Sequence, residues 1–244
     1  MRGRIRSQGL KSLAKIVRPP GDESTSSRRN RVAATRRKRG THRMPGKDPP
    51  EVVELFDRIV ELVPRAIEFN GTIVRSVGTK YANAGEFLSG GGAAKYGGRW
   101  NQPGLRAVYA SLDIITATLE AYQNFLNYGF SLSVIRPRVT AGATAKLSAV
   151  LDLTDPTVRR KVGFTLTELV EEDWSEIQAA GEEAWTQAIG RGCREAGFEA
   201  ILVPSARRNG GKNIAIFPDR LAGGSILELL AADDLPPHPT LWSS

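Results

Sequence analysis

Cysteine and histidine are scarce in this chain of 244 residues. The single cysteine, Cys193, excludes an intrachain disulfide and leaves too few thiols for a zinc cluster. The two histidines, His42 and His238, lie towards the two ends of the sequence, which argues against a histidine-based triad or a multi-histidine metal site. We therefore expect no metal, and any catalysis must depend on Arg, Glu, Asp, Tyr, Ser or Lys.

Long apolar runs are also missing. No run approaches the roughly 18 residues that a transmembrane helix requires, and the N-terminus lacks the apolar stretch of a secretory signal. Hydrophobic residues still make up 41% of the chain, which is enough for a globular core. We predict a cytoplasmic protein without membrane association.

The net charge of +8 is distributed unevenly along the chain. Residues 1–50 contain 15 Lys/Arg and 3 Asp/Glu, whereas residues 51–244 contain 19 Lys/Arg and 23 Asp/Glu. The first segment has no sustained apolar periodicity, so we predict a disordered basic arm there. The remainder is mildly acidic, and the overall pI is therefore a misleading indicator of nucleic-acid binding.

Several interpretations of the arm stay open. It is a solvated tail, a segment that contacts DNA or another anionic surface, or the product of a mis-assigned start, with Met44 as the true first residue. An Arg-rich leader also resembles an organelle transit peptide. We predict that the arm precedes one domain over residues 51–232 and a flexible tail over residues 233–244.

Helices and strands alternate irregularly after residue 50, with a turn expected at residues 70–71. The expected helices run from residue 50 to a bend or end at Pro64, from a cap at Ser111 to residue 129, from Asp155-Pro156 onward, and over most of 165–196. The expected strands are 72–77, 106–111, 130–139, 149–154, 198–206, 213–218 and 225–230. This irregular order favours an α+β domain over a doubly wound parallel sheet.

A glycine-rich segment over residues 85–98 is expected to form a long loop without a helix. It contains neither a P-loop nor a Rossmann fingerprint. Its continuation, "GGRWN", combines glycines that allow close backbone approach with a guanidinium fork and a rigid apolar ring. The candidate binding residues here are Gly98, Arg99, Trp100 and Asn101.

Four further polar residues lie in or near predicted strands. Arg75 interrupts an apolar strand, and arginine is rarely buried unless it is paired. Tyr109 lies near the end of a strand and can stack on a flat ring. Glu120 follows eleven residues later in a helix and can stabilise positive charge. Ser205 follows a strand and has no core histidine to activate it, so we interpret it as a hydrogen-bond donor. Locally, Arg75 and Glu120 are also compatible with ordinary solvent-facing positions, which are the commoner place for a glutamate, and Ser205 with a plain turn position, which its local sequence favours.

The order of these motifs is more specific than any one of them. Arg75, "GGRWN", "VYAS", a glutamate eleven residues past the tyrosine, "LDLT", and "VPSA" followed by Asn213 together resemble the RES-domain family, which is named for its Arg, Glu and Ser. The resemblance covers roughly residues 70–230. It implies a fold similar to ADP-ribosyltransferases and a toxin that degrades NAD⁺ by hydrolysis or phosphorolysis.

The resemblance also implies roles for individual residues. Glu120, Arg75 and Ser205 match the family's catalytic set, while Arg99 and Tyr109 match its substrate-binding residues. NAD⁺ would be a consumed substrate, with inorganic phosphate as a co-substrate, and no cofactor is expected. The implied partner is an Xre-type helix-turn-helix antitoxin that covers the active site. A carboxylate suits this chemistry because positive charge grows on the ribose as neutral nicotinamide leaves.

Three other functions stay open at this stage. The nearest is ADP-ribosyl transfer to a protein, which breaks the same bond and differs only in the acceptor. A non-enzymatic nucleic-acid-binding protein would act through the basic arm and bind with strong salt dependence. A metabolic enzyme outside any toxin pair is the third.

Overall fold

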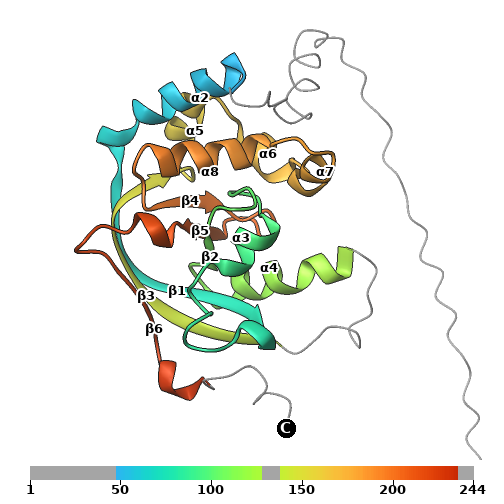
Figure 1. Ribbon diagram of the computed structural model, residues 1–244, viewed down its shortest axis with the longest axis vertical. Helices are drawn as coiled ribbons and strands as arrows, with labels where there is room; N and C mark the ends of the chain where they lie inside the picture. The colour runs from blue at the N-terminus through green and yellow to red at the C-terminus, as the bar shows by residue number, and fades with distance from the viewer. Residues whose placement is uncertain (1–47, 128–137, 236–244) are drawn as a thin grey trace, which may run out of the picture.

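The computed structural model describes residues 48–127 and 138–235, with side chains omitted for 123–127 (Figure 1). Nearly all of the predicted arm and most of the predicted tail and of the strand over residues 130–139 lie outside the described residues. Among the described residues, no helix is long and apolar enough to cross a membrane.

A mixed six-stranded sheet forms the centre of the fold, as expected for an α+β domain. Its order is β1-β2-β5-β4-β3-β6, and β1 also pairs with β3. Only β3 and β4 run parallel among the described pairs. The strands are β1 (Ile67–Gly78), β2 (Val108–Ser111), β3 (Arg138–Asp152), β4 (Ala200–Pro204), β5 (Lys212–Ile216) and β6 (Ile226–Leu229).

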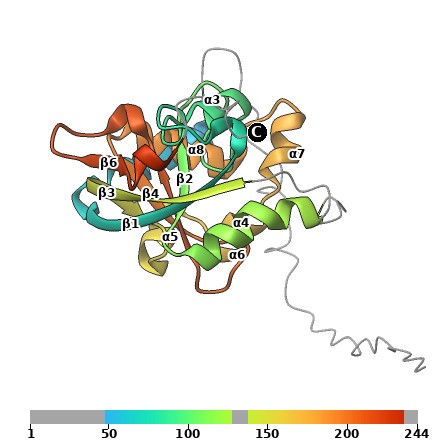
Figure 2. The same cartoon turned by 90° about the horizontal axis from the view of Figure 1, so that it is seen from below.

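The helices form two groups around the sheet. Figure 1 shows α2, α5, α6, α7 and α8 gathered on one side, whereas Figure 2 shows α4 lying along β1 and β3. The α-helices are α2 (Pro50–Val60), α3 (Gly91–Tyr96), α4 (Ile114–Asn127), α5 (Pro156–Val162), α6 (Leu166–Glu171), α7 (Trp174–Ala179) and α8 (Trp185–Glu195). The short 3₁₀ helices are η1 (Val63–Arg65), η2 (Thr79–Tyr81), η4 (Pro218–Arg220) and η5 (Ala232–Asp234).

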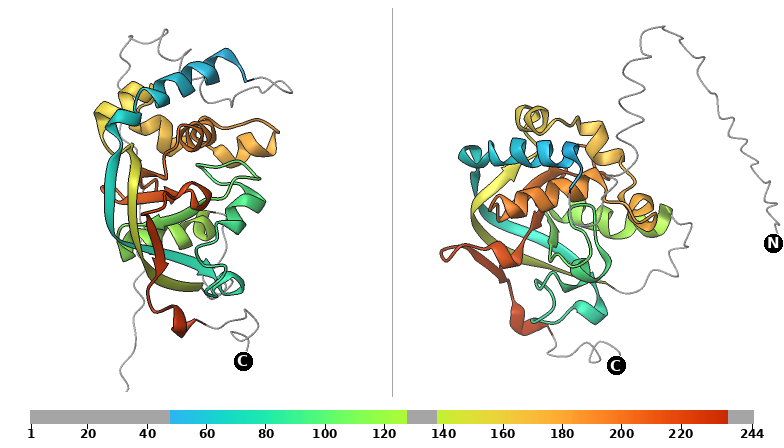
Figure 3. Two further views of the ribbon diagram at one scale, coloured as in Figure 1. Left: turned by 60° about the vertical axis from the view of Figure 1, so that its left-hand side comes forward. Right: turned by 45° about the horizontal axis from the view of Figure 1, so that its top comes forward.

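The expected turn at residues 70–71 is wrong, because both residues lie inside β1. Asn70 and Gly71 pair with Lys146 and Ala145 of β3 in a continuous register. The ladder of β1 and β3 satisfies the backbone groups of both strands over this length, and that outweighs the local turn preference of Asn-Gly. Figure 3 shows the two strands curving side by side.

The second half of the predicted strand pattern also needs correction. Residues 138–152 form one long strand, β3, rather than two short ones. Small residues dominate its first half, and small residues carry little strand signal of their own. Its pairing with β1, β4 and β6 keeps this segment extended.

The glycine-rich segment was expected to be a loop but contains the short helix α3. Gly90 caps its start with a φ of 69°, and a Cβ there would lie 3.0 Å from the backbone nitrogen of Ala107. Glycine is required because an L side chain would be strained in this left-handed conformation. The helix places the following "GGRWN" turn against the sheet.

Helix starts were predicted correctly in one case and wrongly in another. Asp155 caps α5 by accepting a hydrogen bond from the Thr157 backbone N–H, as expected. The predicted cap of α4, Ser111, instead donates to the Asn213 side chain. Asp113 takes over the cap, since its carboxylate accepts from the Thr116 backbone N–H at 2.9 Å.

Candidate active site

A pocket of about 650 Å³ opens where β1 leaves β2. The two strands pair only at Val74 and Ser111, so the chain beyond Val74 is free to separate from β2. This volume suits a ligand of drug or nucleotide size. The residues most relevant to chemistry in its lining are Arg75, Ser76, Gly98, Arg99, Trp100, Tyr109, Glu120, Arg138, Arg207 and Asn213.

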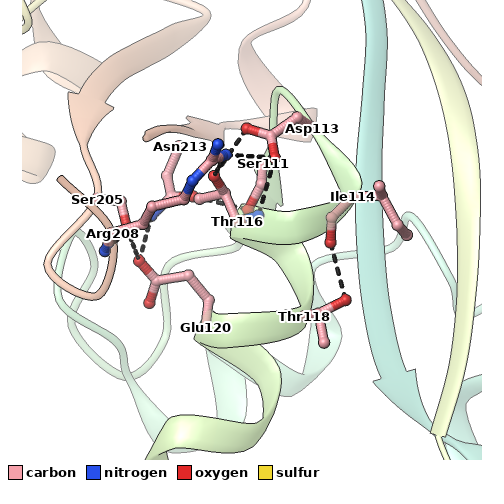
Figure 4. A network of polar contacts seen from close by, with 9 residues as sticks. All are labelled: Ser111, Asp113, Ile114, Thr116, Thr118, Glu120, Ser205, Arg208 and Asn213. Atoms are coloured by element: carbon pink, nitrogen blue, oxygen red, sulfur yellow. Dashed lines mark hydrogen bonds and ion pairs between the residues drawn. The ribbon is translucent and has the colours of Figure 1, made fainter. Parts of the chain in front are cut away.

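The Glu120 carboxylate is held by two side chains from other elements of the fold. Oε1 accepts a hydrogen bond from the Ser205 hydroxyl at 2.6 Å and another from the Asn213 amide at 2.7 Å. Figure 4 shows the second carboxylate oxygen pointing away from both donors. Glu120 is therefore not the ordinary solvent-facing helix residue that its local sequence also allowed, and its position is set from two separate elements.

Ser205 supports Glu120 from behind and does not itself line the pocket. Its hydroxyl oxygen accepts the backbone N–H groups of Arg207 and Arg208, both at 3.1 Å, which orients its proton towards Glu120. The residue is only 9% exposed. Ser205 is thus a hydrogen-bond donor, as interpreted from the sequence, and no histidine activates it among the described residues.

A second set of contacts fixes the loop that follows Ser205. The Arg208 guanidinium donates to the Asp113 carboxylate at 2.6 Å and to the Thr116 hydroxyl at 3.0 Å (Figure 4). Asn213 is fixed in the same way, because its amide oxygen accepts from the Ser111 hydroxyl at 2.7 Å. The start of α4 is therefore tied to both donors of Glu120.

Arg75 reaches the pocket from β1. Its Nη1 donates to the Tyr109 backbone carbonyl at 2.7 Å, and its Nε is buried with no hydrogen-bond partner among the described residues. Burial, and then the nearby charge of Arg138, lower the pKa of Arg75 to about 10, which leaves the group cationic at neutral pH. An unpaired buried donor of this kind favours an anionic ligand.

Arg99 lies in the "GGRWN" turn and contributes both to structure and to the pocket. Its Nη1 donates to the carbonyls of Leu169 and Glu172, each at 2.9 Å, which ties the turn to the end of α6. Burial lowers its pKa, whereas the negative charges of Glu172 and Glu120 raise it. The charge of Glu120 is therefore felt by Arg99, and the two face one pocket.

Tyr109 holds the "GGRWN" turn against β2. Its hydroxyl accepts from the Trp100 backbone N–H at 2.8 Å and donates to the Asn101 side chain at 2.7 Å. Burial raises the pKa of Tyr109, so the phenol stays neutral. A Cβ on Gly98 would lie 2.6 Å from this hydroxyl, which explains the glycine there.

The other two predicted binding residues of the turn are mainly buried. Asn101 does not line the pocket, and its amide nitrogen donates to three backbone carbonyls, that of Ala93 in α3 and those of Gln102 and Leu105 in its own loop. Trp100 is 4% exposed and packs in the core while presenting part of its surface to the pocket. These contacts position the loop, whereas Arg99 faces the cavity.

Sequence reasoning missed Arg138 and Gln187. Arg138 lines the pocket from β3, and its start-of-strand position gave no signal of this. Gln187 on α8 is fully buried and donates to the Gly98 carbonyl at 3.1 Å, which fixes the turn from below. Gln187 stands among apolar residues in the sequence of α8, which is a signal that it could be buried. A buried amide needs hydrogen-bond partners.

The fold and pocket together define an α+β domain with a fixed carboxylate facing several arginines, a site suited to an anionic substrate that develops positive charge. The chain belongs to the RES domain family, which matches residues 72–236. Six of the eight predicted residues line one pocket, namely Arg75, Gly98, Arg99, Trp100, Tyr109 and Glu120, and Ser205 contacts it through Glu120.

Known relatives share much of the chain. NAD(+) phosphorylase MbcT of Mycobacterium tuberculosis is 30% identical over 191 residues, which is 75% of this chain and 95% of that protein. The probable NAD(+) phosphorylase Rv3189 of the same species is 34% identical over 121 residues, or 49% of this chain and 53% of that protein. A crystal structure of the M. tuberculosis MbcT-MbcA toxin-antitoxin complex matches the fold with a TM-score of 0.56 at 24% identity, covering 78% of this chain and 97% of that one.

Proposed function

We propose that this protein consumes NAD⁺ as a substrate by breaking the bond between nicotinamide and ribose, with inorganic phosphate as the acceptor. The observation that carries the proposal is the Glu120 carboxylate, fixed by Ser205 and Asn213 at the wall of an arginine-lined pocket. The names of the relatives, both NAD(+) phosphorylases, support phosphate over water as the acceptor.

Breaking this bond requires neither a metal nor a general acid, because nicotinamide leaves as a neutral molecule. The C1–N bond of the ribose breaks, and its electron pair neutralises the pyridinium ring of nicotinamide as it leaves. Positive charge develops on the ribose, and the Glu120 carboxylate lies in the pocket to stabilise it. A phosphate oxygen then forms the new bond to C1, which gives nicotinamide and an ADP-ribose phosphate ester.

The arginines of the pocket supply the positive charge that binding of NAD⁺ and phosphate requires. NAD⁺ carries a diphosphate and the acceptor is an anion, so the pocket must neutralise negative charge before reaction. Arg75 and Arg99 supply cationic donors in the lining of the pocket. Tyr109 is neutral and fixed by its own hydrogen bonds, so its exposed ring surface is available for packing against ribose or nicotinamide.

Product analysis tests the proposal and separates it from its alternatives. The full chain is incubated with NAD⁺ with and without inorganic phosphate, and products are identified by mass spectrometry. Phosphorolysis predicts nicotinamide plus a phosphorylated ADP-ribose that requires added phosphate. Free ADP-ribose in both buffers would indicate hydrolysis, label on protein would indicate ADP-ribosyl transfer, and intact NAD⁺ would contradict the proposal.

We also propose a protein antitoxin as the partner. The matching crystal structure is that of the MbcT-MbcA toxin-antitoxin complex. An Xre-type helix-turn-helix domain stays our prediction for the partner of this chain. Co-expression with the product of the adjacent gene, followed by co-purification and assay of NAD⁺ loss, tests it: a bound partner should suppress the activity.

A further inference from the structure

A second arginine, Arg138, lines the same pocket as Arg75 and is half-buried. Arg138 begins β3, where it pairs with Gly78 of β1. Its Nε donates to the Ser76 hydroxyl at 3.1 Å, and its Nη2 donates to the Ser76 carbonyl at 2.7 Å. One edge of the guanidinium is thereby fixed, and Nη1 has no partner among the described residues.

Two guanidinium groups in one pocket require a counter-charge. No carboxylate of the described residues pairs with Arg75 or Arg138, and the buried Nε of Arg75 has no hydrogen-bond partner there. Two like charges repel, and the repulsion grows as water is excluded. The cost is removed when an anion with several acceptor oxygens bridges the two groups.

Arg138 and the Glu120 carboxylate are held by different residues. Ser76 orients Arg138 from the β1–β3 side, whereas Glu120 is held on α4 by donors from the β4–β5 loop and from β5. Arg99 feels the charge of Glu120, and Arg75 feels the charge of Arg138. The pocket therefore contains the Glu120 carboxylate and two arginines, Arg75 and Arg138, whose side chains are held by contacts of their own.

We propose that Arg138 and Arg75 form a subsite for a phosphoryl anion, in which Ser76 positions Arg138. The inference rests on the proposed function, because that function supplies both candidate anions: the free phosphate acceptor and the diphosphate of NAD⁺. Planar guanidinium groups suit such oxyanions better than an ammonium group does.

Binding of inorganic phosphate and of inorganic pyrophosphate, measured by calorimetry on the full chain, tests the subsite without turnover. Arg138→Gln should weaken the binding of at least one of the two anions by about tenfold or more, since a charge-assisted hydrogen bond is lost. Arg138→Lys keeps the charge but loses the planar guanidinium group, so its affinity for the anion should lie between those of the wild type and Arg138→Gln. The exposed Arg160→Gln on α5 is the matched control and should bind as the wild type does.

The pattern of loss identifies the source of the anion. Weakened phosphate binding with a raised KM for phosphate assigns the subsite to the acceptor. Weakened pyrophosphate binding with a raised KM for NAD⁺ assigns it to the substrate diphosphate. Unchanged binding of both anions in a folded Arg138→Gln protein would overturn the proposal.

Two further results keep the test decisive. If Arg138→Gln fails to fold, Ser76→Ala removes only one orienting bond and should weaken the same anion by a smaller factor; an unchanged affinity there would also count against the subsite. If the wild type leaves NAD⁺ intact yet binds the anions through Arg138, the subsite stands and the proposed function fails.

Discussion

The hydroxyl of Ser205 donates a 2.6 Å hydrogen bond to the carboxylate of Glu120, across 85 residues of sequence. A charge-assisted bond this short holds a carboxylate in one orientation. Asn213 provides the second donor, on the same oxygen. The relationship gives a serine without a catalytic base a place in the site, because its hydroxyl holds the Glu120 carboxylate.

Removing the Ser205 hydroxyl should therefore lower kcat more than it changes KM. Ser205→Ala should reduce kcat for NAD⁺ loss by about tenfold or more, because one of two donors to Glu120 is lost. Ser225→Ala is the matched control, since Ser225 makes the same kind of bond to Glu199, at 2.7 Å, outside the pocket. A tenfold rise in KM with unchanged kcat would instead place Ser205 in substrate binding.

Tyr109→Phe should destabilise the protein and loosen the "GGRWN" turn together. The substitution leaves the Trp100 N–H and the Asn101 carbonyl oxygen without their partner. Burying such groups unpaired costs about 1–3 kcal/mol in the free energy of unfolding, which denaturant titration measures. In a cycle with Asn101→Ala, the two changes should be strongly non-additive; simple additivity would show that the hydroxyl acts elsewhere.

Gly190 should tolerate no side chain, whereas its helix neighbour Gly192 should tolerate one better. A Cβ on Gly190 would lie 1.9 Å from the Trp100 carbonyl oxygen, a backbone atom. A Cβ on Gly192 would meet only side-chain atoms of Phe56 and Ile59, at 2.8–2.9 Å. Gly190→Ala should therefore lower the melting temperature well below that of Gly192→Ala and reduce activity through Trp100. Equal melting temperatures would contradict this packing.

Glu199 should make part of the stability sensitive to acid. Burial opposes its ionisation, but hydrogen bonds from Ser225, Ala222 and Ser148 outweigh burial and lower the pKa of Glu199 below 4.5. The unfolded chain then binds the proton more readily, so this contribution is full above pH 4.5 and is lost as pH falls through the lower folded value.

Comparison with Glu199→Gln tests the sign of that effect. The wild type should exceed the variant in free energy of unfolding at pH 7, and the difference should shrink as pH falls below 4.5. The exposed Glu228→Gln should keep the wild-type acid profile. A difference between wild type and Glu199→Gln that is constant with pH would show that the carboxylate charge does not contribute.

Glu120, Arg75 and Arg99 could be proposed as site residues from the sequence because they follow one another in a recognisable order, with Arg75 in a strand, Arg99 in a glycine turn and Glu120 in a helix. Glu120 was compatible with a solvent-facing position until the loop carrying Ser205 was placed beside it. That contact joins segments far apart in the chain, and no local pattern encodes it. Asn213 was visible only as a member of the motif order, not as a donor to Glu120.

Arg138 could not be predicted, because its place depends on the register between β1 and β3. The pairing of Arg138 with Gly78 brings it to Ser76. A turn was expected at residues 70–71, and two short strands were expected where β3 is one long strand. The register between β1 and β3 therefore could not be inferred from the sequence. Local preferences identified most strands, but the long pairing of β1 with β3 overrode them.

The most direct measurement of the central claim is nicotinamide release from NAD⁺ by Glu120→Gln beside the wild type, in phosphate, with Glu228→Gln as a control for loss of a carboxylate. The substitution keeps the side-chain shape and removes the charge that stabilises the developing cation. We expect the rate to fall by about a hundredfold or more, with the melting temperature little changed. Release at the wild-type rate by folded Glu120→Gln would contradict the account.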